Sequence, residues 1–264
     1  MHTIRTTTLA ALYSTLLLSP FLTTSVHAQS VTEIGPSIQR YSLTQSTGKR
    51  FATNGTLQGI TIQNTSASPS LQHDATKTLS LSLHNNSNLS SSYTTTDTNT
   101  PTTLANSKVT LARLGYQVEL NDIFSDISIG AGTSLDYTSH KLTNEGSSQS
   151  YYPISNKALL GRLLMKSAPK PGYPGTISWE LAIEYPLWSK STIGLYSGTQ
   201  QRDLSKSISV SYQFTTRLSL KTSYQSSINL KGPDQTYSLS GRTYTEQVAA
   251  SRQSSRTISL LYAF

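Results

Sequence analysis

Cysteine is absent from this 264-residue sequence, so no disulfide bond stabilises the fold. Charged residues are scarce at 13%, although the 21 Lys and Arg outnumber the 13 Asp and Glu. These cations are scattered singly through Ser- and Thr-rich sequence and do not cluster on a helix. Phosphate-backbone binding needs such clustering, so we expect no nucleic acid among the partners.

Long apolar runs are also lacking. Beyond the N-terminal segment, no window is apolar enough for a membrane-spanning helix, and segment 158–165 is interrupted by Arg162. No window sustains the i, i+3, i+4 apolar spacing of an amphipathic helix. The sequence contains neither a Gly-rich phosphate loop nor a cysteine–histidine metal pattern, so we expect no cofactor and no metal.

The first 28 residues have the features of a secretory signal peptide. Arg5 precedes an interrupted apolar stretch over 9–22, and the small residues around Ala28 offer a cleavage site before Gln29. Cleavage there removes one positive charge from the net +8, because Arg5 is the only charged residue in this segment, and leaves +7. We expect residues 29–264 to form a single exported domain.

Apolar and polar residues alternate with a period of two through much of the remaining chain. The pattern is clearest over 114–120, 127–137 and the terminal segment 256–264, where every second residue from Ile258 to Phe264 is apolar or aromatic. Such segments predict β-strands with one apolar face. A soluble β-sandwich would also alternate, but the signal peptide and the aromatic terminus favour a barrel whose apolar face contacts lipid.

The terminal segment resembles the C-terminal recognition strand of Gram-negative outer-membrane β-barrel proteins. That pattern has a polar residue, a glycine two positions later and two aromatic residues that end the chain. Thr257, Tyr262 and Phe264 match it, whereas Ser259 stands where glycine is usual. The resemblance implies a closed antiparallel up-and-down transmembrane barrel in the bacterial outer membrane. It also implies contact with lipid and lipopolysaccharide, and with the barrel-assembly machinery through Tyr262 and Phe264.

Two strand counts fit the alternation. Counting every candidate from 38–45 to 256–264 gives about twelve strands, which we prefer; assigning the weak segments 191–199 and 236–244 to outer loops gives ten. We expect residues 29–36 to be a short leader. The Ser/Thr/Asn-rich segments 85–106 and 141–155 are predicted as long outer loops, because membrane barrels pair long outer loops with short inner turns.

Eight charged residues share the polar side of the predicted strands. They could line a constriction that filters small polar solutes, or they could pair and fill the lumen as a plug; barrels of ten to twelve strands lie between filled and open ones. The favoured function is a narrow porin-like channel, and the alternative is a closed structural or adhesive barrel with displayed loops. The lumen candidates are Arg113, Glu119, Arg162, Lys166, Glu180, Glu184, Arg217 and Lys221.

A hydrolase is the least supported alternative. Ser134, Asp136 and His140 share a strand face, but their spacing covers about 20 Å at ~3.3 Å per residue, too far for a nucleophile and its base. The sequence has no G-x-S-x-G and no H-E-x-x-H motif. His73 and His84 flank a predicted turn without a defined metal geometry. We therefore assign no catalytic residue and expect no enzyme activity.

Two features predict the level of the membrane surface. Trp179, Tyr185 and Trp188 are typical of the aromatic belt at the lipid headgroups. Arg256 shares the parity of the lipid-facing row but begins its strand. We expect it to meet headgroup phosphate, since Arg costs roughly 2–4 kcal/mol at the bilayer midplane and about 0–1 at the interface.

Overall fold

The computed structural model describes twelve segments of the chain. They are residues 30–45, 50–68, 75–94, 101–124, 126–143, 154–167, 174–193, 196–199, 202–230, 234–239, 242–247 and 250–264. The predicted signal peptide and His73 lie outside these segments. Within them, no helix is long and apolar enough to cross a membrane.

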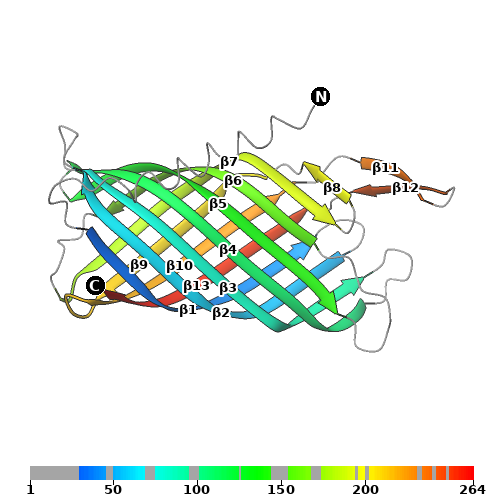
Figure 1. Cartoon of the computed structure of the whole chain (residues 1–264), viewed down its shortest axis with the longest axis horizontal. Helices are drawn as coiled ribbons and strands as arrows, with labels where there is room; N and C mark the ends of the chain where they lie inside the picture. The colour runs from blue at the N-terminus through cyan, green and yellow to red at the C-terminus, as the bar shows by residue number, and fades with distance from the viewer. Residues whose placement is uncertain are drawn as a thin grey trace, which may run out of the picture.

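Ten strands of the described chain form one closed antiparallel barrel (Figure 1). In chain order they are β1 Ser30–Gln45, β2 Arg50–Ser68, β3 Ala75–Thr94, β4 Pro101–Phe124, β5 Ile127–Thr143, β6 Ile154–Ser167, β7 Ile177–Ile193, β9 Ser205–Gln213, β10 Leu218–Asn229 and β13 Ser251–Ala263. Pairing of β1 with β13 closes the sheet, with Ile38 opposite Ile258. Closure satisfies the backbone groups that an open edge would leave unpaired.

The remaining strands lie outside the barrel sheet or extend it. Strand β8 (Tyr196–Thr199) folds back on the end of β7, while β11 (Asp234–Leu239) and β12 (Arg242–Gln247) pair only with each other. Of the two expected counts, the structure has the alternative one, ten. The weak segments 191–199 and 236–244 do not cross the barrel, because β7 continues through Trp188 to Ile193 and the β11–β12 hairpin stands apart (Figure 1).

The two ends of the barrel differ. At the end that we call the terminal end, Ser30 begins β1 and Phe264 ends the chain, and the connection from Gln213 to Leu218 is tight. The opposite end, the loop end, carries β8, β11 and β12 (Figure 1). The short connections after β4 and β9 lie at the terminal end and the longest ones, after β7 and β10, lie at the loop end, as in membrane barrels.

Polarity is inverted relative to a water-soluble protein. Large apolar side chains are exposed on the outer face, up to 68% for Leu163 and 77% for Phe264, whereas Glu119, Glu184 and His140 are fully buried. Strand β13 shows the alternation directly: Ile258, Leu260 and Tyr262 are exposed, and Ser259 and Leu261 are buried. A water-soluble monomer rarely exposes so extensive an apolar surface.

Two expectations about polar segments are wrong. The predicted leader 29–36 is almost entirely β1, which pairs with β2 from Ser30 and with β13 from Glu33. Most of the predicted loop 85–106 belongs to β3 and β4, and Leu89 within it is buried. Neighbouring strands supply the backbone partners, and hydroxyls bond across strands, as Ser91 Oγ does to Ser107 Oγ at 2.7 Å. Polar composition alone therefore did not exclude strand.

The barrel seam requires a glycine. A Cβ at Gly35 would lie 1.7 Å from the carbonyl oxygen of Leu260 across the β1–β13 pair. The missing side chain lets the first and last strands approach closely enough to pair.

Candidate functional site

One group of ion pairs joins four consecutive strands inside the barrel. Arg113 on β4 donates to Glu184 on β7, and its Nε lies 3.5 Å from Asp136 Oδ1 on β5. Arg162 on β6 lies 2.5 Å from Glu180 Oε1 and 3.5 Å from Glu184 Oε1. Glu184 therefore sits between two guanidinium groups that approach it from different strands.

A second ion pair connects β6 with β4. Lys166 Nζ contacts Glu119, whose carboxylate also accepts hydrogen bonds from Gln117 Nε2 at 2.6 Å and from Thr76 Oγ1 at 3.1 Å. The Glu119 side chain has no exposed surface. Three donors thus replace the water that this carboxylate loses on burial.

Polar bridges from β10 reach two other strands. Gln225 Nε2 donates to Glu184 Oε2 at 2.9 Å, so Glu184 has a third partner. Lys221 Nζ lies 3.5 Å from Gln63 Oε1 on β2, three strands away around the barrel. These side-chain contacts connect strands that are not hydrogen-bonded neighbours in the sheet.

Arg217 does not join this inward-facing group. The bend 214–217 ends before β10 begins at Leu218, so the alternation of that strand does not fix the direction of Arg217. Its side chain is exposed, and a hydrogen bond with Tyr262 raises the pKa of its guanidinium. The prediction that Arg217 shares a face with Lys221 is therefore wrong.

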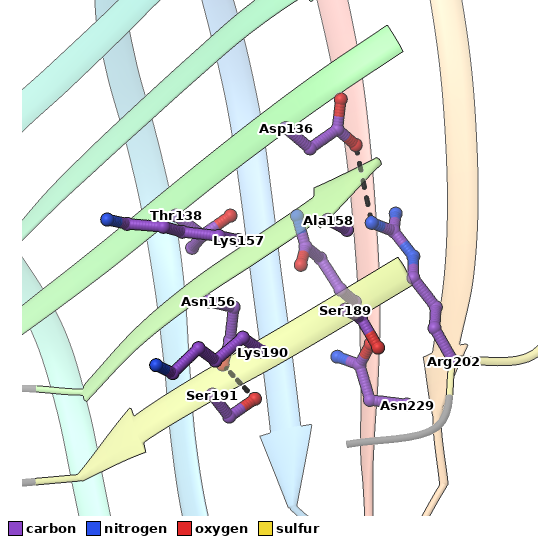
Figure 2. Close-up of a pocket in the computed structure, with 11 residues that line it drawn as sticks. Asp136, Thr138, Asn156, Lys157, Ala158, Ser189, Lys190, Ser191, Arg202 and Asn229 are labelled. Atoms are coloured by element: carbon purple, nitrogen blue, oxygen red, sulfur yellow. Dashed lines mark hydrogen bonds and ion pairs between the residues drawn. The ribbon is translucent and has the colours of Figure 1, made fainter. Parts of the chain in front are cut away.

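Asp136 also receives a cation from outside the barrel strands. Arg202, which precedes β9 and forms an isolated bridge with Asn229, places Nη1 3.3 Å from Asp136 Oδ2 (Figure 2). A cavity of about 20 Å³ lies beside this pair, and Ser191 Oγ donates to Asn156 Oδ1 at 2.6 Å on its wall. The approach of Arg202 reduces the opening of the barrel near the loop end.

The larger internal cavity measures about 190 Å³. Its lining includes Arg113, Arg162, Glu180, Lys221, Gln63 and His84. It is smaller than the roughly 300–1,000 Å³ of typical small-molecule sites. Positive and negative side chains both line this cavity. A solute that entered it would therefore meet charged groups that already form ion pairs with each other.

The residues of the hydrolase hypothesis are engaged elsewhere. Ser134 Oγ accepts a hydrogen bond from Arg113 Nη2 at 3.0 Å, and Asp136 pairs with two arginines. His140 Nε2 lies 3.0 Å from the Tyr41 hydroxyl. These contacts do not bring Ser134, Asp136 and His140 together as a catalytic set.

Of the metal site that the sequence raised and did not favour, the structure describes only His84. His84 Nε2 lies 2.8 Å from Ser37 Oγ, and its former partner in that hypothesis, His73, lies outside the described residues. Among described residues, no three His, Cys, Asp or Glu side chains are grouped to hold a metal ion.

An apolar cluster that the sequence did not predict lies inside the barrel. It fills the wall formed by β1 to β4 towards the loop end, beyond the charged group. Val109 and Leu111 have the same parity as Arg113, and extending that parity toward the N-terminus of β4 would have found them. The members are Tyr41, Leu43, Leu57, Leu89, Val109 and Leu111.

Comparison with known proteins adds evidence for the fold. No protein-family model and no curated protein sequence matches the chain. The structure is similar to the outer membrane protease OmpT of Escherichia coli, with a TM-score of 0.54, 9% identity and coverage of 91% of this chain and 99% of that one. This chain has the fold of the bacterial outer-membrane β-barrels. At such low identity the likeness concerns the fold alone.

Other outer-membrane barrels are similar at lower scores. The translocator domain of the autotransporter NalP from Neisseria meningitidis has a TM-score of 0.41 and 14% identity, with 97% of this chain and 95% of that chain covered. The toluene transporter TodX of Pseudomonas putida has a TM-score of 0.33 and 11% identity, with 91% of both chains covered.

Proposed function

We propose that residues 29–264, released from a signal peptide cleaved after Ala28, span the bacterial outer membrane as a barrel closed to solutes. Its activity then lies in the surface displayed at the loop end. The exposed apolar face supports the membrane location, because lipid is the solvent in which that face is stable. The short turns at the terminal end support a periplasmic position for both termini.

The observation that carries the proposal is the set of contacts across the lumen. Arg113 and Gln225, which belong to strands on different sides of β7, both bond to Glu184. Tyr41 on β1 meets His140 on β5, four strands away around the sheet. An open pore needs water along its length, whereas these side chains meet one another and bury Glu184 completely.

A narrow channel for small polar solutes is the second candidate. It is favoured by the cavity of about 190 Å³, which is lined by charged side chains as a selectivity constriction would be. To conduct, the barrel would have to separate Arg113 from Glu184 and move Arg202 away from Asp136. Each separation leaves buried charge unpaired, which is costly.

Single-channel recording in planar bilayers distinguishes the two candidates. We expect the refolded mature chain to insert without step-like conductance at moderate voltage. The triple variant Arg113→Ser, Glu184→Ser, Arg202→Ser should conduct. It removes the contact of Arg113 with Glu184 and that of Arg202 with Asp136, and it leaves the backbone ladder intact. Reproducible ohmic steps from the unaltered chain would contradict closure and favour the channel.

A further inference from the structure

The outer face of the barrel carries two rows with the same composition. In the first, Tyr137 on β5 lies opposite Lys157 on β6, which lies opposite Lys190 on β7. In the second, Tyr224 on β10 lies opposite Arg256 on β13, which lies opposite Arg40 on β1. We call these the lysine row and the arginine row. Both belong to the exposed face of their strands.

Each row contains a direct pairing of like charges. Residues opposite each other on one face of a sheet have Cβ atoms about 4.5–5.5 Å apart, and like charges there are destabilising. Among the described residues, no carboxylate lies within ion-pair distance of Lys157, Lys190, Arg40 or Arg256, since the ion pairs formed there all lie inside the barrel. Both rows therefore present concentrated positive charge.

The tyrosine has the same position in both rows. Lys157 Nζ lies 6.0 Å from the centre of the Tyr137 ring, and Arg256 Cζ lies 5.9 Å from that of Tyr224. At these separations the ring attracts the cation and holds it near the surface. Figure 2 shows Lys157 and Lys190 extending to the same side from adjacent strands.

The layers on either side of the rows also match. On the terminal side of the lysine row stand Leu135, Leu159 and Trp188, and on that side of the arginine row stand Thr222, Ile258 and Ile38. On the loop side both rows are followed by three hydroxyls: Ser139, Ser155 and Thr192 in one case, Ser226, Ser254 and Ser42 in the other. Each row thus lies where a largely apolar surface gives way to a hydroxyl-bearing one.

We propose that the two rows bind the phosphate groups of lipid A, the phosphorylated glycolipid of the outer leaflet. A phosphate placed between two cations neutralises their repulsion and accepts charge-assisted hydrogen bonds from both. Acyl chains would then lie along the apolar side of each row, and sugar hydroxyls along the serine side. The proposal rests on the membrane orientation proposed above and names a partner for the loop end.

Carboxylates do not compete for these rows in the described chain. Among the residues whose exposure the structure describes, the exposed carboxylates are Asp126 and Asp203, and both lie in connections outside the barrel strands. The cation Lys77 provides a matched control, because it has the outward parity of its strand but stands near the terminal end of β3, opposite Val118. At that end the proposal predicts no lipid A phosphate.

The test uses the full mature chain folded in detergent micelles, with bound lipid counted by native mass spectrometry. We expect tight retention of bisphosphorylated lipid A and at least tenfold weaker retention of a phosphate-free lipid A. The variants Lys157→Gln/Lys190→Gln and Arg40→Gln/Arg256→Gln should each lose one retained lipid, whereas Lys77→Gln should lose none. Millimolar inorganic phosphate should not displace the lipid.

Two results would overturn the inference. One is equal retention of the phosphorylated and phosphate-free lipids by the unaltered chain, a comparison that needs no variant to fold. The other is displacement by inorganic phosphate, which would indicate a general anion site. Gel migration that changes on boiling reports barrel folding separately, and conductance reports closure, so failure of lipid binding remains distinguishable from failure of the proposed function.

Discussion

At the scale of single residues, Glu184 is a buried carboxylate whose partners come from three other strands, β4, β6 and β10. It contacts Arg113, Arg162 and Gln225 and has no exposed surface. The sequence placed it on the inward face but could not name its partners. Arg113 precedes it by 71 residues, and only the closed sheet brings their strands to the same part of the lumen.

Neutralising Glu184 should destabilise the barrel strongly. The variant Glu184→Gln keeps the side-chain volume but leaves two partly buried guanidinium groups without this carboxylate, and removing one partner of a buried pair costs about 3–5 kcal/mol. Urea unfolding in lipid vesicles measures the loss. Glu180→Gln is the control, since Glu180 has one direct ion pair and is 16% exposed, and its loss should be clearly smaller. Equal losses would show that Glu184 is not central to the ion-pair group.

At the scale of elements, the alternation of apolar and polar residues predicted which face of a strand is exposed better than it predicted where the strand begins and ends. The exposed row of β13 was predicted correctly, because a period of two is a local property of the sequence. The extent of β3 was not, because the Ser- and Asn-rich residues after His84 have the composition of a loop. Their strand structure depends on pairing with the neighbouring strands β2 and β4, which the local composition does not reveal.

Replacing Phe264 should impair barrel assembly in cells. Tyr262 and Phe264 pack edge to face with ring centres 5.1 Å apart, and the Phe264 amide donates to Thr32 O on β1 at 2.9 Å. We expect Phe264→Ser to lower the amount of folded chain in the outer-membrane fraction several-fold. Phe214→Ser, at the same end of the barrel but not at the terminus, is the control and should have a weaker effect. Unchanged levels of the Phe264 variant would argue against a terminal assembly signal.

At the scale of the whole molecule, the closed hydrogen-bonded sheet and its apolar outer face both fit a lipid environment. A sheet whose outer face carries Leu163 and Ile177 at 68% and 66% exposure is stable in lipid, and lipid permits no unpaired sheet edge. The sequence predicted this architecture from alternation and the terminal aromatic residue. It left the strand count open, because segment 191–199 alternates whether it crosses the barrel or, as observed, contributes the end of β7 and the short β8.

The most direct test of lipid contact uses the two tryptophans, Trp179 and Trp188, which both lie on β7. Trp188 is 46% exposed on the outer face. In vesicles of lipids brominated on their acyl chains, the account predicts strong quenching of tryptophan emission, and a Trp179→Phe variant, which keeps Trp188 alone, should retain it. Emission that is unaffected by brominated lipid, from a chain that stays monodisperse in buffer without detergent, would contradict the account.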